Sequence, residues 1–220
     1  MLDSTKPAPR AIRLVVSGLG NIGLRFIGIL RDKQAHVRDQ YGIEFTVVGA
    51  ADSRGCAADP LGLDLATVVA LKERGQSIAA YRLYGQPWQP PLELVEQTDA
   101  DALCEATPVS LQDGEPGLSC IRAALNKGMH VVTANKGPLV LAYDELTALA
   151  RAQGVGLRFC GTVAGGLPAI NLGQRDLAGA TIERLEALPN LTTSFILDQM
   201  TQGKSYAQAL AAAQAQGCAE

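Results

Sequence analysis

The sequence predicts an α/β protein whose main part, residues 12–159, is a doubly wound parallel sheet. Short aliphatic runs alternate there with segments of helical periodicity, and this alternation is typical of parallel strands joined by crossover helices. The 23 glycines lie mainly beside apolar runs and aromatic residues make up only 5% of the chain, which favours an aliphatic core with tight turns. The pattern changes near residue 160, so we expect part of a second domain over residues 160–220.

The first two strands and helices follow directly from these runs. Residues 12–17, IRLVVS, are aliphatic and end at a glycine, which predicts a strand and a turn. The helix that follows, over residues 21–34, has apolar residues at helical spacing: Ile22, Phe26, Ile29 and Leu30. A second aliphatic run at 45–51 predicts a strand that ends at Asp52, and residues 64–75 predict the next helix.

Residues 76–91 interrupt this alternation. They contain Tyr84, Trp88 and three prolines, so we expect an excursion or a short antiparallel element there. The alternation then resumes with a strand at 101–107, a helix at 115–128, a strand at 130–135, a helix at 143–153 and a strand at 156–160. Five strands therefore alternate with helices, as a parallel sheet requires.

The second domain opens with a glycine-rich loop, GTVAGGLPAI, at residues 161–170. We expect a strand at residues 183–188, ERLEAL, and helices from there through Tyr206 and Leu210 to an alanine-rich end.

Charge and hydropathy exclude two classes of partner. The net charge is −3, from 19 Lys and Arg against 22 Asp and Glu, and no basic run is present, so we expect no nucleic-acid binding. No apolar stretch reaches the roughly 18 residues of a membrane span, so we expect no membrane partner.

The tail and the cysteines indicate the cytoplasm. Residues 1–11 contain an acid and two prolines and lack the apolar core of a signal peptide, so we expect a flexible tail. Five cysteines form no CxxC pair and are odd in number, which favours reduced cytosolic thiols over a zinc site or a disulfide set.

A G-x-G-x-x-G motif lies between the first strand and its helix, and this context is what gives the motif its meaning. Its residues are Gly18, Leu19, Gly20, Asn21, Ile22 and Gly23. The first glycine permits the tight turn, the second lets a pyrophosphate approach the backbone, and the third lets helix and strand pack closely. The helix N-terminus would bind the anion through its N–H groups and its dipole. The motif predicts a dinucleotide site.

The end of the second strand bears on the choice of dinucleotide. Asp52 lies 29 residues after Gly23, beyond the about 20 expected for the acid that binds the adenosine ribose, and a long first crossover would account for this. A carboxylate favours the free hydroxyls of NAD, whereas Arg54, beside Ser53, could accept the 2′-phosphate of NADP. The sequence therefore predicts NAD or NADP without deciding between them.

Three further motifs follow the glycine loop in order. They are TANKGPL at 133–139, GTVAGGLPAI at 161–170, and TTSFIL at 192–197 with the ending G-C-A-E at 217–220. With these four motifs the chain resembles homoserine dehydrogenase from about residue 12 to its last residue. The resemblance implies a Rossmann-like nucleotide domain joined to an α+β catalytic and dimerisation domain, a homodimer, and the interconversion of homoserine and aspartate 4-semialdehyde with NAD or NADP.

The resemblance also implies roles for single residues. Lys136 would be the catalytic lysine near nicotinamide and substrate, and Thr107 would contact the cofactor. An ammonium group beside a developing alkoxide or carbonyl oxygen stabilises charge or relays a proton. The family's monovalent-cation site, taken as sodium, would fall on the main-chain carbonyls of Cys160, Val163, Gly165 and Leu167.

Two features of the second domain depart from the family pattern. Thr192 belongs to the paired threonines of the substrate turn, but residues 188–191 lack the glycines that the family has there. Glu220 matches the substrate-binding glutamate, and the family's substrate aspartate and second catalytic lysine would come after it. We therefore expect residues 1–220 to be the front two-thirds of an enzyme and to be inactive alone.

Other functions fit less well. No tyrosine has a lysine four residues later, as short-chain dehydrogenases require, and no cysteine has the setting of a phosphorylating semialdehyde dehydrogenase. A methyltransferase would not explain TANKGPL. The alternative of another class is a catalytically inactive, dehydrogenase-like protein that binds nucleotide or partner subunits.

Overall fold

The computed structural model describes residues 8–187 and 190–217. The chain divides into two compact units, residues 1–162 and residues 163–220, and each is described by itself.

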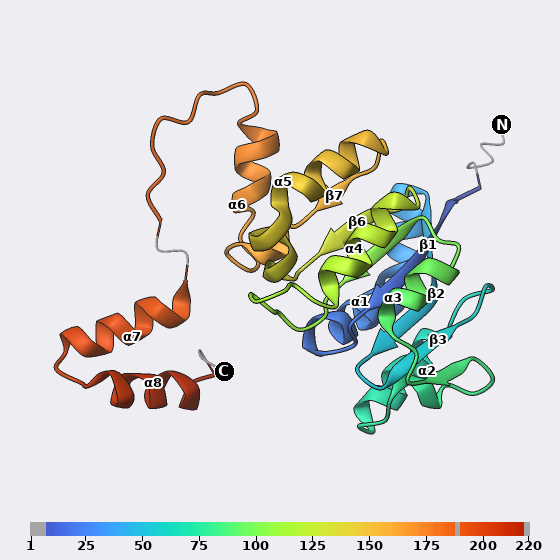
Figure 1. Ribbon diagram of the computed structural model, residues 1–220, viewed down its shortest axis with the longest axis horizontal. Helices are drawn as coiled ribbons and strands as arrows, with labels where there is room; N and C mark the ends of the chain where they lie inside the picture. The colour runs from blue at the N-terminus through green and yellow to red at the C-terminus, as the bar shows by residue number, and fades with distance from the viewer. Residues whose placement is uncertain (1–7, 188–189, 218–220) are drawn as a thin grey trace, which may run out of the picture. The chain divides into compact units, whose positions relative to one another are not determined.

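The first unit is built on one seven-stranded sheet (Figure 1) with the order β4-β3-β2-β1-β5-β6-β7. Its strands are β1 (Arg10–Ser17), β2 (Ile43–Asp52), β3 (Gly55–Ala58), β4 (Gly85–Pro87), β5 (Ala102–Glu105), β6 (His130–Thr133) and β7 (Leu157–Arg158). The five strands predicted from the sequence are β1, β2, β5, β6 and β7, and all of them pair in parallel. The chain runs outward from β1 to β2 on one side and from β5 to β7 on the other.

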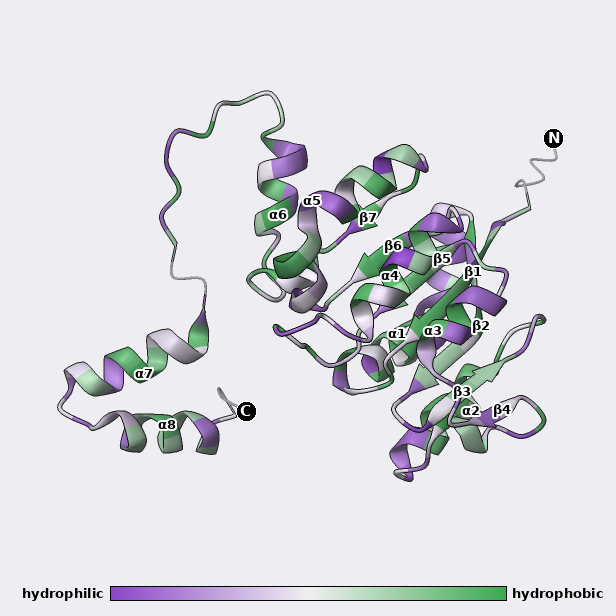
Figure 2. Cartoon of the chain, viewed as in Figure 1, coloured by the Kyte–Doolittle hydropathy of each residue, from purple (hydrophilic) through white to green (hydrophobic). Residues whose placement is uncertain are grey.

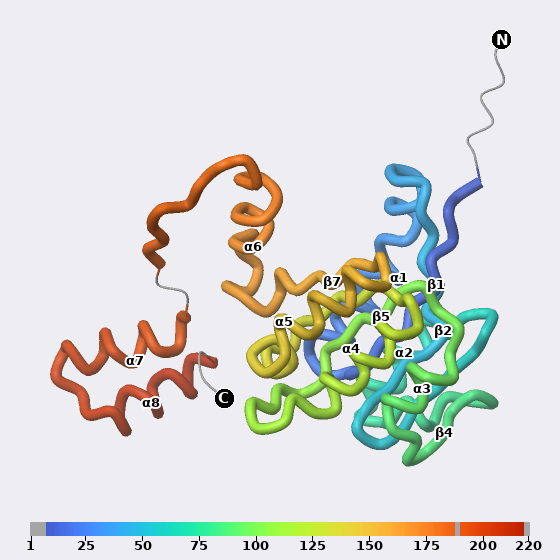
Figure 3. Tube along the Cα trace, turned by 45° about the horizontal axis from the view of Figure 1, so that its top comes forward, coloured from blue at the N-terminus to red at the C-terminus, as the bar shows by residue number. Residues whose placement is uncertain are grey.

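Helices cover both faces of this sheet. They are α1 (Asn21–Tyr41), α2 (Leu65–Glu73), α3 (Pro91–Gln97), α4 (Gly117–Asn126) and α5 (Lys136–Ala152). Helices α1 and α2 contact each other. Helix α4 contacts both α3 and α5, and Figures 1 and 3 show it between them. This is the doubly wound architecture predicted from the sequence.

The core is aliphatic and lies on both faces of the sheet. In β1, Leu14, Val15 and Val16 are all buried, although neighbouring side chains of a strand point to opposite faces. A strand buried on both faces is typical of a parallel sheet under two helical layers. Figure 2 accordingly shows β1, β5 and β6 as mainly hydrophobic. The thiols of Cys56, Cys104 and Cys120 belong to this interior, and burial raises the pKa of each to about 12.

Residues 76–91, predicted as an excursion or a short antiparallel element, contain β4, whose partner β3 lies earlier in the chain and was not predicted. Strand β3 pairs antiparallel with both β2 and β4, and a 3-10 helix, η1 (Ile78–Ala80), lies between α2 and β4. The excursion therefore extends the sheet at one edge.

Helix α5 begins earlier than the sequence predicts. It starts at Lys136 rather than near residue 143, because the Asn135 side chain accepts a hydrogen bond from the Gly137 N–H at 3.0 Å and caps the helix. The backbone is non-helical at Ala142 (φ −144°, ψ 31°), so the predicted helix is the part after a kink.

The first unit ends with a short 3-10 helix, η2 (Cys160–Thr162). The described residues of the second unit form helical elements, which are α6 (Ala169–Asn171), the π-helical turn η3 (Leu172–Asp176), α7 (Leu191–Thr201) and α8 (Tyr206–Ala215). Helix α8 begins with a capping box between Ser205 and Gln208, and it packs on α7 through Ile196, Ala209 and Ala213. The predicted helices at this end are therefore present.

The strand predicted at residues 183–188 is wrong over the part that the structure describes. Residues 181–187 are exposed and form neither helix nor strand. A strand needs a neighbouring strand to pair its N–H and C=O groups, and the described residues of the second unit include no strand. Within the described ranges, no helix has the length and apolar character needed to cross a membrane.

Candidate functional site

The glycine loop lies at the carboxyl end of β1. Gly18 has a φ of +96°, and its N–H donates to the Ala51 carbonyl of the neighbouring strand at 3.0 Å. A β-carbon at Gly18 would lie 2.4 Å from the carbonyl oxygen of Ala106, so only glycine fits where the loop passes the end of β5. The loop is thus held between β2 and β5.

The other two glycines of the motif have different surroundings. A β-carbon at Gly23 would lie 1.8 Å from the Gly18 carbonyl oxygen, so this glycine allows helix α1 to approach the turn. A β-carbon at Gly20 would have nothing within 4 Å, so the chain leaves open space there. This is the position at which a pyrophosphate is expected to approach the backbone.

The N-terminus of α1 supplies donors to this space. Gly20 caps the helix without a side-chain hydrogen bond, and the first N–H groups of any α-helix have no partner within it. Leu19 is buried, whereas Asn21 and Ile22 are exposed. The predicted anion cradle therefore has free N–H groups and the positive end of a 21-residue helix.

Asp52, at the end of β2, is buried in a set of four hydrogen bonds. Its Oδ1 accepts from the Arg54 N–H at 2.9 Å and the Ser77 hydroxyl at 2.8 Å, and its Oδ2 from Lys72 Nζ at 2.6 Å and the Ile78 N–H at 2.9 Å. Burial alone would raise the pKa of Asp52, but these hydrogen bonds, led by that from Lys72, lower it below its usual value. A carboxylate has about four acceptor sites, and four hydrogen bonds reach Asp52 here. Because Ser77 and Ile78 belong to the excursion, Asp52 anchors the excursion to β2.

The Asp52 anchor leads to a prediction on stability. Asp52→Asn should lower the free energy of unfolding by about 2 to 4 kcal/mol, because it leaves Lys72 largely buried without its partner. Since the pKa of Asp52 is lowered by folding, this contribution is present at neutral pH and lost as the pH falls below about 4. Urea unfolding of both chains at pH 7 and pH 3 measures it.

Asp32→Asn is the matched control for this experiment. It removes the carboxylate of the exposed Arg31–Asp32 ion pair, and exposed pairs add little to stability. An equal loss of stability in the two variants, or a loss at Asp52 that persists undiminished at pH 3, would contradict the role of the anchor.

The two neighbours of Asp52 point outward from this cluster. Ser53 and Arg54 are exposed, and the Arg54 guanidinium donates from Nη2 to the Gly75 carbonyl at 2.9 Å. A basic group therefore lies at the surface beside a carboxylate already paired with Lys72.

A second buried acid, Glu105, ends β5 in the middle of the sheet. In the sheet, Glu105 pairs with Ser17 of β1 on one side and with Thr133 of β6 on the other. Its Oε1 accepts hydrogen bonds from the Thr107 N–H at 2.8 Å and from the Thr107 hydroxyl, and its Oε2 accepts from the Thr133 hydroxyl at 2.7 Å. Sequence reasoning missed Glu105, although an acid that ends an apolar strand, DALCEAT, was a visible signal.

Asn135 connects this acid to the start of α5. Its N–H donates to the Thr133 hydroxyl at 3.0 Å, and its Nδ2 donates to the Thr107 hydroxyl at 3.2 Å and to the Pro108 carbonyl at 3.3 Å. Glu105, Thr107, Thr133 and Asn135 are all buried. The network holds Thr107 and the first turn of α5 together.

Lys136 is the first residue of α5 and is exposed. Within the described part of the chain, its ammonium group makes no ion pair or hydrogen bond. A cation at a helix N-terminus does not stabilise the helix, because the helix dipole favours cations at the other end. The network thus presents Thr107 and Lys136 at the same sheet edge as the glycine loop, with Lys136 free to contact a ligand.

The remaining predicted residues belong to the end of the first unit and to the second unit. Cys160 is half-buried at the end of the first unit, whereas Val163, Gly165 and Leu167 belong to an exposed turn of the second, in which the Leu167 N–H donates to the Ala164 carbonyl at 3.1 Å. Thr192 is half-buried in α7, and Glu220 lies outside the described residues. Over those residues, no group of three or more His, Cys, Asp or Glu side chains could hold a metal ion.

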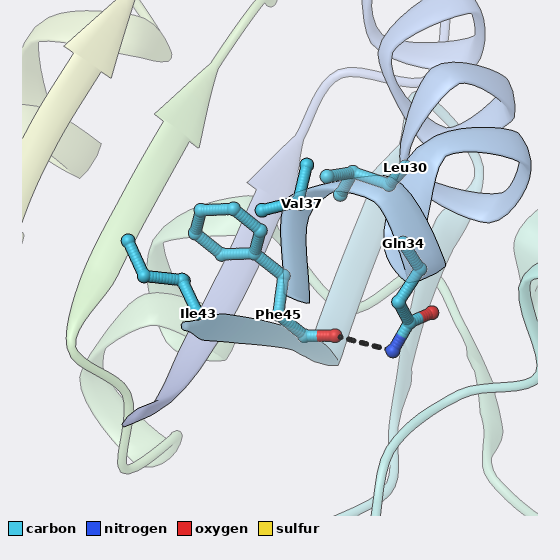
Figure 4. Close-up of a pocket in the computed structure, with 5 residues that line it drawn as sticks. All are labelled: Leu30, Gln34, Val37, Ile43 and Phe45. Carbon is cyan, nitrogen blue, oxygen red and sulfur yellow. Dashed lines mark hydrogen bonds between the residues drawn. The ribbon is translucent and has the colours of Figure 1, made fainter. Parts of the chain in front are cut away.

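A small hollow lies at the opposite, amino end of β2 (Figure 4). Leu30, Gln34, Val37, Ile43 and Phe45 line it, and Gln34 Nε2 donates to the Phe45 carbonyl at 3.3 Å. Its volume of about 10 Å³ would hold roughly one water molecule. It is not a cofactor site.

Comparison with known proteins agrees with this geometry. Residues 18–159 match the family model described as "Homoserine dehydrogenase, NAD binding domain", and residues 168–220 match the model described as "Homoserine dehydrogenase". The chain belongs to the homoserine dehydrogenase family. Residues 18–159 are its NAD-binding domain, and the predicted family and Rossmann-like fold are confirmed.

Similar sequences and structures have the same description. The chain is 37% identical over 208 residues to homoserine dehydrogenase of Methanocaldococcus jannaschii, covering 94% of this chain and 61% of that protein. It is 34% identical over 210 residues to an NAD(+)-dependent homoserine dehydrogenase of Pseudomonas canavaninivorans, covering 94% and 59%. The chain thus spans about 60% of the length of these relatives.

Solved structures of the family resemble the chain as well. The crystal structure of Thermoplasma acidophilum homoserine dehydrogenase matches with a TM-score of 0.76 and 29% identity, over 96% of this chain and 62% of that one. A hyperthermophilic archaeal homoserine dehydrogenase in complex with NADPH matches with a TM-score of 0.81 and 30% identity, over 94% and 62%. These relatives are dehydrogenases, so they support the enzymatic prediction rather than the inactive alternative.

Proposed function

We propose that the protein is a homoserine dehydrogenase that interconverts homoserine and aspartate 4-semialdehyde with NAD or NADP. The observation that carries this proposal is the convergence of the glycine loop, Thr107 and Lys136 on the carboxyl edge of one parallel sheet, within the family's NAD-binding domain. Open α/β sheets bind ligands at this edge, where the strand order reverses, here between β1 and β5.

The residues present fit a dinucleotide. Gly18 and Gly23 form the turn in which a β-carbon would clash, and the space at Gly20 is open to a pyrophosphate. A bound nicotinamide cofactor would supply the hydride chemistry. The adenosine half would lie beside Asp52, Ser53 and Arg54, and the nicotinamide half beyond β5, beside Thr107 and Lys136. Both NAD and NADP are compatible with Asp52 paired to Lys72 and Arg54 at the surface.

Two residues of the chain would have direct roles, one at the substrate oxygen and one in positioning the cofactor. The ammonium group of Lys136 would donate a hydrogen bond to the oxygen that changes between alcohol and aldehyde, and so stabilise negative charge on it. Thr107 would form part of the wall against the cofactor, with its hydroxyl and N–H fixed by Glu105.

The second unit would contribute to substrate binding and assembly. Thr192 and Glu220 would contact the substrate, and the carbonyls of Cys160, Val163, Gly165 and Leu167 would bind a sodium ion. The protein would be a cytoplasmic homodimer. The substrate, sodium and homodimer assignments rest on the resemblance to the family, and the cytoplasmic location rests on the cysteine pattern and the N-terminal tail.

The test of the function is an assay of the complete gene product with homoserine and either NAD or NADP. We expect reduction of the cofactor, followed at 340 nm, that depends on homoserine. A well-folded complete product that binds dinucleotide and shows no homoserine oxidation would overturn the proposed reaction.

A further inference from the structure

We propose that Glu105 is a specificity-determining residue for the redox state of the cofactor. Its buried carboxylate would favour the oxidised dinucleotide, whose nicotinamide ring carries a positive charge, over the reduced form, whose ring is neutral. The inference rests on the proposed function for the position of the ring, and on the structure for the charge.

The hydrogen bonds around Glu105 match the acceptor sites of an ionised carboxylate. The Thr107 N–H can only donate, and it donates to Oε1 at 2.8 Å. The Thr133 hydroxyl accepts from the Asn135 N–H, and its own proton is directed at Oε2. An ionised carboxylate accepts all of these hydrogen bonds at once.

This charge has no full positive partner. Glu105 is 1% exposed and makes no ion pair within the described residues, whereas the other buried acid at this edge, Asp52, is paired with Lys72. Partial compensation comes from the start of α4, since a β-carbon at Gly117 would lie 3.0 Å from Glu105 Oε1. Neutral hydroxyls, amides and a helix end make the burial tolerable but leave a net negative charge inside the sheet edge.

The position of Glu105 directs this charge toward the nicotinamide half. The residue pairs with the last residues of β1 and β6, at the point where the strand order reverses. The glycine loop passes close to Ala106, the residue after Glu105, since a β-carbon at Gly18 would meet the Ala106 backbone. With the adenosine half over β2, the other half must cross this point toward β6. A positive ring placed there would lie beside the strand end that carries Glu105.

The experiment measures the dissociation constants of NAD+ and NADH for the 220-residue chain by calorimetry. In Glu105→Gln, we expect the ratio Kd(NADH)/Kd(NAD+) to fall about three- to tenfold, as an attraction between two charges of low solvent exposure would give. Thr133→Val removes one donor and keeps the charge, so its ratio should stay within about twofold of the native value. Glu145→Gln removes an exposed charge and should leave the ratio unchanged.

A second measurement needs no variant. Carbon-13 NMR of the glutamate side-chain carboxyls in the native chain should show Glu105 ionised at pH 7, with and without NAD+.

The outcomes separate the two proposals. A shift of both affinities by the same factor in Glu105→Gln, or a protonated Glu105 at pH 7, would overturn this inference alone and leave a purely structural role. A native chain that binds neither form would overturn the proposed function and this inference with it.

Discussion

Replacing Gly20 with valine should abolish measurable dinucleotide binding while the fold is kept. The glycine has extended angles, φ −81° and ψ −157°, with a negative φ that does not require glycine. A β-carbon there meets nothing within 4 Å, so the protein itself has room for the side chain. The valine would instead occupy the space in which the pyrophosphate meets the helix N-terminus. We expect affinity to fall by at least about a hundredfold, or roughly 2.7 kcal/mol.

Gly28→Val is the matched control for Gly20→Val. Gly28 belongs to the same helix, and a β-carbon there also has open space. This variant should bind NAD+ and NADH as the native chain does. Calorimetry gives the affinities and thermal unfolding monitors the fold. Native affinity in a folded Gly20→Val chain would show that the glycine loop is not the pyrophosphate site.

Replacing Lys136 with alanine should lower kcat for homoserine oxidation by the complete gene product by about 100- to 10,000-fold. The affinity for NAD+ should change little, because the ammonium group acts at the substrate oxygen rather than on the cofactor. The fold should also be kept, since Lys136 is exposed and its helix is capped by Asn135. Steady-state kinetics and calorimetry together separate the two effects.

Two further variants sharpen the Lys136 experiment. Lys136→Arg keeps a positive charge in a different shape, so it should recover only part of the rate. Lys33→Ala removes an exposed lysine in the middle of α1 and should have native kinetics. A Lys136→Ala enzyme with near-native kcat would remove Lys136 from the reaction, whatever its effect on KM.

The sequence was sufficient for the five parallel strands because its information there is local. Aliphatic runs between glycines identify β1 and β2, and the same pattern identifies β5, β6 and β7. The start of α5 was missed because it depends on a cap at Asn135 and is followed by a kink at Ala142. The residues between them show no clear helical periodicity in the sequence. The strand expected at residues 183–188 failed since strand formation depends on a partner, which a local pattern does not include.

The candidate site was only partly predictable for a similar reason. The glycine motif and Lys136 lie in recognisable contiguous segments. The contacts of Asp52 and Glu105 join residues that are distant in the sequence: Lys72 is 20 positions from Asp52, and Thr133 is 28 positions from Glu105. Both acids end buried strands and look alike in the sequence, yet one is paired with a lysine and the other with hydroxyls and amides.

The Asp52 anchor sets a rule for engineering the cofactor preference of this protein. Exchanging the acid at the end of β2 is a direct way to convert a dinucleotide site, but here that acid also ties Lys72, Ser77 and Ile78 to the sheet. A one-residue exchange would loosen the whole antiparallel edge along with the ribose pocket. Redesign should therefore keep Asp52 and vary the exposed pair Ser53 and Arg54, because the hydrogen bonds of Asp52 to Lys72, Ser77 and Ile78 then remain.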